Sequence, residues 1–155
     1  MSFRIRGLTV EPFRHLFGLP DEALAAHGAR RYVVDKTPGF PDRIELRDLE
    51  PGERALLVNF MHQPADTPYR ASHAIFVREG AETTYQAVDA IPEVLRGRIL
   101  SVRAFDAAHM MVEADVVDGR NAALLIGTML DHPGVAYLQI HYAKRGCYAA
   151  HVERA

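Results

Sequence analysis

The segment His62–Ser72 carries the side chains best suited to holding a charged ligand. It lies between two apolar stretches and is longer than an ordinary hairpin connection, and long loops of this kind often carry function. Tyr69 offers a phenol and Arg70 a planar guanidinium, a natural pair for a carboxylate or a phosphate group. In the alternative interpretation, Arg70 pairs with Asp66 or with an acid at a strand end and only locks the loop.

His141 and Cys147 are the second candidate pair, because a thiol and an imidazole can act as nucleophile and general base. The turn Lys144–Gly146 has glycine in its third position, which favours a three-residue turn with a G1 bulge. This register places both side chains on one face of the last hairpin, about 7–8 Å apart. A two- or four-residue turn would place them on opposite faces. The alternative interpretation is a small, half-buried cysteine beside a turn.

The histidines and the single cysteine show no spacing typical of a metal site. His62, His73 and His141 could approach Cys147, and imidazole and thiolate are good zinc ligands, but there is no CxxC, HxxxH or HxH pattern. We therefore expect no metal ion. The chain also has no glycine-rich phosphate loop and no GxSxG nucleophile elbow, and we expect no other cofactor.

Strand patterns dominate the middle of the chain and would position the candidate loop. Arg54–His62 is apolar on both faces, which indicates a central strand that is covered on both sides. Ala74–Glu79 follows the loop as the next strand. These two strands would hold the ends of the loop together.

A strict alternation of apolar and polar residues runs over Asp42–Arg47. This period of two predicts a further strand, with Ile44 and Leu46 facing inward. Arg43 and Arg47 then belong to the outer, solvated face.

The second half of the chain predicts the order strand, strand, helix, strand, strand. Ile99–Phe105 and Met110–Val117 precede a helix that ends at Leu130, and Val135–Ala143 pairs with Cys147–Arg154 in the final hairpin. Successive strands joined by short turns indicate an α+β fold. We expect one domain over residues 1–155, with a predominantly antiparallel sheet of six or more strands and a few short helices packed on it.

Composition excludes several classes of protein. The net charge is −2, and basic pairs such as Arg30-Arg31 and Lys144-Arg145 do not extend into a run, so we expect no nucleic-acid partner and interpret these pairs as solvated strand edges. No segment is long and apolar enough to span a membrane, and the first residues lack the apolar region of a secretory signal. With one cysteine and no intrachain disulfide, we expect a reducing, cytoplasmic location.

Four segments of the chain resemble a small bacterial family, the domain of unknown function 1203. They are FRIRGL near the start, HQPADTPYRAS followed by IFVREG, EADVVDG at Glu113–Gly119, and HYAKRGCYAAHVERA at the end. The His-x-Pro-x-x-x-Pro-Tyr-Arg loop and the His…Arg-Gly-Cys-Tyr end occur together and in order. The resemblance implies a bacterial origin and a shared fold, and it implies no activity.

Two hypotheses of function follow. In the first, the protein binds a small anionic ligand between the His62–Ser72 loop and the hairpin end that carries Cys147. Arg70 would hold the anion, His62 and Tyr69 would hydrogen-bond to it, and His141 would act as a general acid or base if a reaction is catalysed.

In the second hypothesis the protein is an interaction module. The sheet face that bears Tyr137, Gln139 and His151 would then pair with another protein or with a second copy of the chain as a homodimer. The two hypotheses differ in where the candidate side chains point. Convergence on one concavity favours the first, and a flat surface with an apolar centre favours the second.

Overall fold

A computed structural model describes residues 1–155 and contains nine strands in two sheets. Six strands form sheet A: β1 (Phe3–Arg6), β5 (Gln86–Val88), β6 (Ile99–Phe105), β7 (Met111–Asp118), β8 (Tyr137–Tyr142) and β9 (Tyr148–Arg154). Three strands form sheet B: β2 (Arg30–Val33), β3 (Arg54–Gln63) and β4 (Ala71–Arg78). The helices are short: α1 (Asp21–Ala26), α2 (Glu93–Arg96), α3 (Ala122–Asp131) and the 3-10 helices η1 (Arg14–Leu16) and η2 (Gly119–Asn121).

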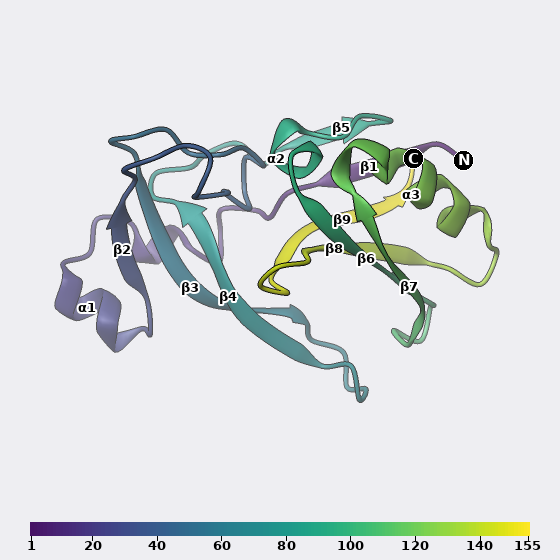
Figure 1. Ribbon diagram of the computed structural model, residues 1–155. Coiled ribbons are helices and arrows are strands. Elements are labelled where there is room, and N and C mark those ends of the chain that lie inside the picture. Colours follow the sequence, from purple (N-terminus) through teal and green to yellow (C-terminus); the bar gives the residue numbers. More distant parts are fainter.

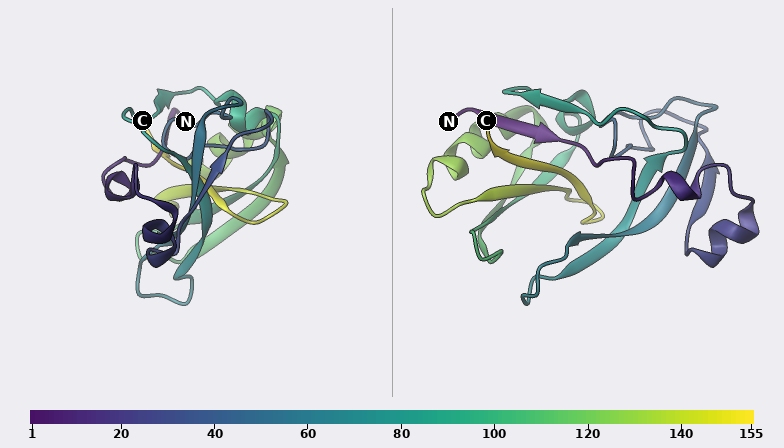
Figure 2. Two further views of the ribbon diagram at one scale, coloured as in Figure 1. Left: turned by 90° about the vertical axis from the view of Figure 1, so that its left-hand side faces the viewer. Right: turned by 180° about the vertical axis from the view of Figure 1, so that it is seen from behind.

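Every strand pairing within the two sheets is antiparallel. The order is β5-β1-β9-β8-β6-β7 in sheet A and β2-β3-β4 in sheet B, and the sheets lie side by side (Figure 1). The two termini lie next to each other near α3 in all views (Figure 2). The predicted α+β class with a predominantly antiparallel sheet is confirmed. No helix is long and apolar enough to cross a membrane.

The core of sheet A lies between its strands and α3. Ile126, Met129 and Leu130 recur on one side of the helix and are buried, which is the spacing that lets an amphipathic helix cover a sheet. They pack in one cluster with Leu100 and Val102 of β6. The end of β3 packs against the opposite face of sheet A, where Gln63 donates to the Tyr137 hydroxyl and Gln139 donates to the carbonyl of His62.

Sheet B is covered on both sides of β3, as its apolar sequence predicts. Leu56 and Val58 are buried in a cluster that also includes Ile75, while Ala55 belongs to a smaller cluster on the other side. Tyr148 of β9 packs into the cluster of sheet B. This side chain therefore joins the two sheets.

The predicted strand over Asp42–Arg47 is wrong, because this segment is an irregular loop. An isolated bridge joins Pro41 and Asp48, the residues that flank the segment, and no strand forms between them. The Asp42 carboxylate accepts hydrogen bonds from the backbone N–H groups of Glu45 and Arg78, at 2.6 and 2.7 Å, and this turns the chain. Arg43 consequently points inward and is 1% exposed, instead of facing solvent.

The predicted three-residue turn in the last hairpin is also wrong. The N–H of Tyr142 donates to the carbonyl of Cys147 at 2.9 Å, so four residues, Ala143–Gly146, form the turn. Beyond the turn, His141 lies opposite Tyr148 and Ile140 opposite Ala150, which leaves an extra residue on β9 as a bulge. Cys147 and His141 therefore lie on opposite faces of the hairpin.

Gly119 marks a close approach of η2 to the end of α2, and it provides a test of this packing. A Cβ at this position would collide with the carbonyl oxygens of Leu95 and Arg98. Gly119→Ala should lower the free energy of unfolding by about 2 kcal/mol, measured by urea denaturation. The control is Gly127→Ala in α3, where space is open, and it should raise stability by roughly 0.5–1 kcal/mol. Equal effects of the two substitutions would contradict the packing.

Candidate functional site

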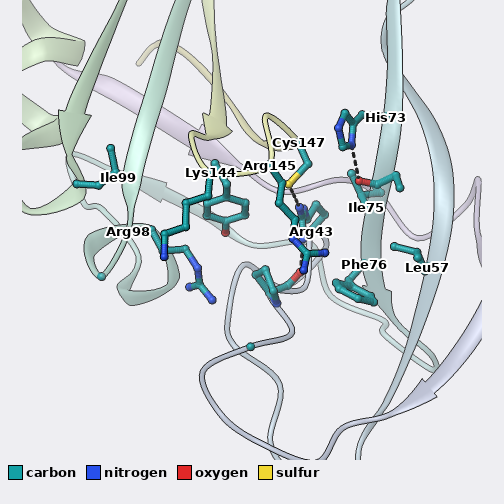
Figure 3. Close-up of a pocket in the computed structure, with 15 residues that line it drawn as sticks. Arg43, Leu57, His73, Ile75, Phe76, Arg98, Ile99, Lys144, Arg145 and Cys147 are labelled. Atoms are coloured by element: carbon teal, nitrogen blue, oxygen red, sulfur yellow. Dashed lines mark hydrogen bonds between the residues drawn. The ribbon is translucent and has the colours of Figure 1, made fainter.

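A cavity of about 470 Å³ lies where the turn of the β8–β9 hairpin approaches the edge strand β4. Figure 3 shows Ile75 and Phe76 of sheet B on one side, and Arg98 and Ile99 across from them. Arg43 rises between the two sides. The cavity therefore has an apolar wall from sheet B. Its basic side chains come from the β8–β9 turn and from Arg98, which directly precedes β6.

The loop over Asp42–Arg47 places Arg43 in this cavity by pairing with the outer edge of β4. The backbone N–H of Arg43 donates to the carbonyl of Phe76 at 3.2 Å, and Asp42 accepts from the N–H of Arg78. These two contacts extend sheet B by one short, irregular segment. They fix the Arg43 backbone so that its side chain runs beneath the turn of the β8–β9 hairpin.

The Arg43 guanidinium makes three hydrogen bonds, and none of them is to a carboxylate. Nε donates to the carbonyl of Tyr148 at 2.8 Å and Nη1 to the carbonyl of Pro41 at 2.6 Å. Nη2 donates to Sγ of Cys147 at 3.1 Å. The cation also lies 4.9 Å from the centre of the Tyr142 ring. Because buried charges are normally paired, a fully buried arginine without an acidic partner stands out.

The remaining charged groups around the cavity are also basic. Arg98 is paired with Asp48 through two hydrogen bonds, of 2.9 and 2.6 Å. Lys144 and Arg145 are exposed on the turn and form no ion pair. No aspartate or glutamate lines the cavity, so its field favours an anion.

The hydroxyl of Tyr142 adds a polar group that has no partner. Tyr142 lines the cavity and is 5% exposed, and its hydroxyl oxygen is buried without any hydrogen bond. Burial raises the pKa of Tyr142 to about 12 despite the nearby Arg43 and Arg98, so the phenol stays protonated. It can therefore donate a hydrogen bond to a ligand.

The structure brings two of the predicted site residues together, His62 and His141, but it does so within a closed network. Their ring centres are 4.8 Å apart, and Oε1 of Gln139 lies 3.0 Å from a nitrogen of each ring. A neutral ring has a single N–H, so His141 can donate either from Nδ1 to the carbonyl of Gly146 or from Nε2 to Oε1 of Gln139, each 3.0 Å away, but not to both at once. His141 is fully buried, and burial together with the charge of Arg103 lowers its pKa to about 3. It is therefore a neutral, internally bonded side chain.

The other predicted residues lie apart from this pair. Tyr69 packs edge-on against Phe105, with ring centres 6.3 Å apart. Arg70 is exposed and donates to the carbonyl of Pro64 at 2.9 Å, which locks the loop as the alternative interpretation described, although with a carbonyl as the acceptor. Cys147 lines the cavity beside Arg43 and faces away from His141.

Sequence reasoning missed the side chains that dominate the cavity. The alternation over Asp42–Arg47 predicts Arg43 on a solvated strand face, whereas Arg43 is buried, and no sequence pattern marks Tyr142 as a site residue. Lys144 and Arg145 were visible as a basic pair but were interpreted as a strand edge. Only the meeting of three separate segments in space makes these side chains one site, and no local pattern in the sequence signals that meeting.

No group of three or more histidine, cysteine, aspartate or glutamate side chains is arranged to hold a metal ion. A second hollow of about 320 Å³ is lined by His62, His109 and His151 among other residues. The hydroxyl of Tyr137 bonds to Nδ1 of His109 at 2.8 Å and accepts from Gln63 at 2.9 Å. His109 and His62 therefore belong to the hydrogen-bonding network between the sheets, and His151 stacks on Tyr137 beside it.

Comparison with known proteins places the chain in a family. Residues 39–154 match the family model described as "Protein of unknown function (DUF1203)". The chain belongs to the DUF1203 family. Every residue that lines the cavity falls within the DUF1203 match. No match was found among curated proteins or among solved structures.

The unpartnered hydroxyl predicts an unusual response to substitution. Because a buried polar group without a hydrogen bond costs free energy, Tyr142→Phe should raise the free energy of unfolding of the ligand-free protein by about 1 kcal/mol. Urea denaturation at neutral pH measures this change. A loss of stability would mean that the hydroxyl has a stabilising partner.

The lowered pKa of His141 predicts a loss of stability in acid. An unfolded histidine takes up its proton near pH 6.5, whereas the folded protein resists protonation until about pH 3. The contribution of neutral His141 to the free energy of unfolding is therefore complete above pH 6.5, and it falls as the pH drops toward 3. Between pH 7 and pH 5 the loss from this residue should be about 2 kcal/mol.

The control for this prediction is His141→Gln, which does not titrate in this range. Burial also lowers the pKa values of His62 and His151, and these act in the same direction, so the two proteins must be compared. The wild-type protein should lose more stability than the variant from pH 7 to pH 5. Parallel curves would contradict the assignment to His141.

Proposed function

We propose that this protein binds a small organic anion, with a carboxylate or phosphate group, in the cavity between the two sheets. The observation that carries the proposal is Arg43, a buried guanidinium whose partners are two carbonyls, a thiol and an aromatic ring. A bound anion would supply the charge that no acidic side chain provides.

The cavity offers complementary parts for such a ligand. The hydroxyl of Tyr142 and the free N–H groups of Arg43 would donate to the anionic group, while Lys144 and Arg145 would attract it at the mouth. The side chains of Leu57 and Phe76 would contact an apolar body. A mainly apolar pocket with a few converging polar groups is the usual form of a small-molecule site.

This proposal keeps the anionic ligand and the hairpin end that the sequence suggested, and it changes the anchor. Arg43 takes the role assigned to Arg70, whose guanidinium bonds to its own loop. His62 and Tyr69 do not line the cavity, and the side chain of His141 is fully buried and not exposed to it. The proposal is therefore one of binding, with no reaction assigned.

The interaction-module hypothesis has less support. Its proposed surface is occupied within the chain: Tyr137 stacks on His151 with ring centres 5.4 Å apart and accepts a hydrogen bond from Gln63. Gln139 donates to the carbonyl of His62 at 2.8 Å. These contacts hold the β3–β4 hairpin against sheet A and leave little of that face for a second copy.

The proposal is tested by calorimetric titration with benzoate and with inorganic phosphate. Benzoate carries a carboxylate on an apolar body, and phosphate carries charge alone. At least one of them should bind, and Lys144→Ala combined with Arg145→Ala should weaken binding about tenfold, since each lost charge contact is worth about 0.5–1 kcal/mol.

The matched control is Arg30→Ala, which removes an exposed charge from β2 at the opposite edge of sheet B. It should leave the affinity unchanged. Equal losses in the control and the double variant would indicate a nonspecific charge effect. No binding of either anion at millimolar concentration would contradict the proposal and would leave Arg43 as a purely structural link.

A further inference from the structure

The outer edge of β4 is only partly covered by the chain. The carbonyl of Phe76 and the N–H of Arg78 bond outward, to Arg43 and Asp42. Outward-facing and inward-facing residues alternate along an antiparallel strand, so the backbone of Ala74 faces outward as well. The covering segment reaches Phe76 and does not reach Ala74.

The uncovered part of this edge opens into the cavity. Ala74 lines the cavity, and its side chain is exposed. The outward-facing N–H of Ala74 donates no hydrogen bond to another part of the chain. The carbonyl of Ala74 lies 3.0 Å from Nδ1 of His73. An unpaired edge N–H beside a ligand cavity is a donor for the main chain of an incoming segment.

The charges of the cavity lie across from this edge. Figure 3 shows Lys144 and Arg145 across from Ile75 and Phe76, with Arg43 between them. An extended chain that paired with the edge at Ala74 and ran parallel to β4 would carry its carboxyl end toward Phe76, where Arg43 bonds to the strand. Its last side chain would lie against the apolar wall.

We infer that the ligand of this cavity is the carboxyl-terminal end of an extended peptide, which pairs with β4 at Ala74 and places its terminal carboxylate near Arg43, Lys144 and Arg145. This inference rests on the proposed function and narrows the class of anion. It combines two donors that a simple anion would not use together, a free edge N–H and a basic cluster without acids. Addition of a strand to a sheet edge gives affinity through the main chain, and side-chain pockets give specificity.

The test uses pools of N-acetylated tetrapeptides, each pool with one fixed carboxyl-terminal residue, as free acids and as carboxamides. Backbone amide shifts and hydrogen exchange of the ¹⁵N-labelled protein report binding residue by residue. At least one acid pool should shift the Ala74 amide and slow its exchange. The matching carboxamide should bind at least about tenfold more weakly, because it lacks the charge.

Two variants separate peptide pairing from simple anion binding. Ala74→Pro removes the edge N–H at a position where an edge strand tolerates proline, and Ala74→Val keeps it. Ala74→Pro should weaken binding of the peptide acid about tenfold and binding of benzoate much less, whereas Ala74→Val, which retains the N–H, should weaken peptide binding less than Ala74→Pro does. Arg30→Ala, outside the cavity, should change neither affinity.

The outcomes distinguish this inference from the proposed function. If benzoate or phosphate shifts the amides of the cavity and no acid pool protects Ala74, the peptide inference is wrong and the anion site stands. If neither peptides nor small anions shift any amide of the cavity, both are wrong. Equal binding of acids and carboxamides would also overturn the inference, because the carboxylate would then have no role.

Discussion

The arrangement of this protein depends on the buried guanidinium of Arg43. Its three hydrogen bonds reach Pro41 in its own loop and Cys147 and Tyr148 at the start of β9. Its backbone N–H pairs with Phe76 of sheet B. One residue thus connects the irregular loop, the last hairpin of sheet A and the edge of sheet B, and the cavity exists because these three segments meet around it.

This connection has an electrostatic cost that the chain does not offset with an acid. Asp42 is adjacent and buried, but its carboxylate is used by the backbone N–H groups of Glu45 and Arg78, and burial raises its pKa. Asp48 serves Arg98. Carbonyl dipoles and the Tyr142 ring reduce the cost of burying the Arg43 charge without cancelling that charge. The basic lining of the cavity, without an acidic residue, and the phenol without a hydrogen bond support the proposal that it binds an anion.

Elements with strong local patterns could be predicted from the sequence. The doubly apolar run of β3, the helix α3 with its buried stripe, and the strands of the last half follow from periodicity and turns. The order of strands in each sheet depends on long-range pairing, which no local pattern encodes. The split into two sheets could not be predicted either. β4 and β6 have similar strand patterns, and only their pairing partners assign them to different sheets.

The site was less predictable than the fold, for two physical reasons. The alternation over Asp42–Arg47 imitates a strand, yet hydrogen bonds from distant backbone groups to Asp42 bend it into a loop and turn Arg43 inward. In the last hairpin, the bulge on β9 reverses the faces of Tyr148 and Cys147 relative to β8, so Cys147 and His141 lie on opposite faces. Both features depend on a single residue or contact, and a one-residue change of register is enough to move a side chain between faces.

The central claim is that Arg43 shares its cavity with a bound anion, and a crystal structure with 4-bromobenzoate tests it most directly. The bromine gives an anomalous signal that locates the apolar body, and the carboxylate is seen beside it. The account predicts the carboxylate within hydrogen-bonding distance of Arg43 or the Tyr142 hydroxyl, with bromine against Leu57 and Phe76. Anomalous peaks confined to lattice contacts, with nothing between the sheets, would contradict it.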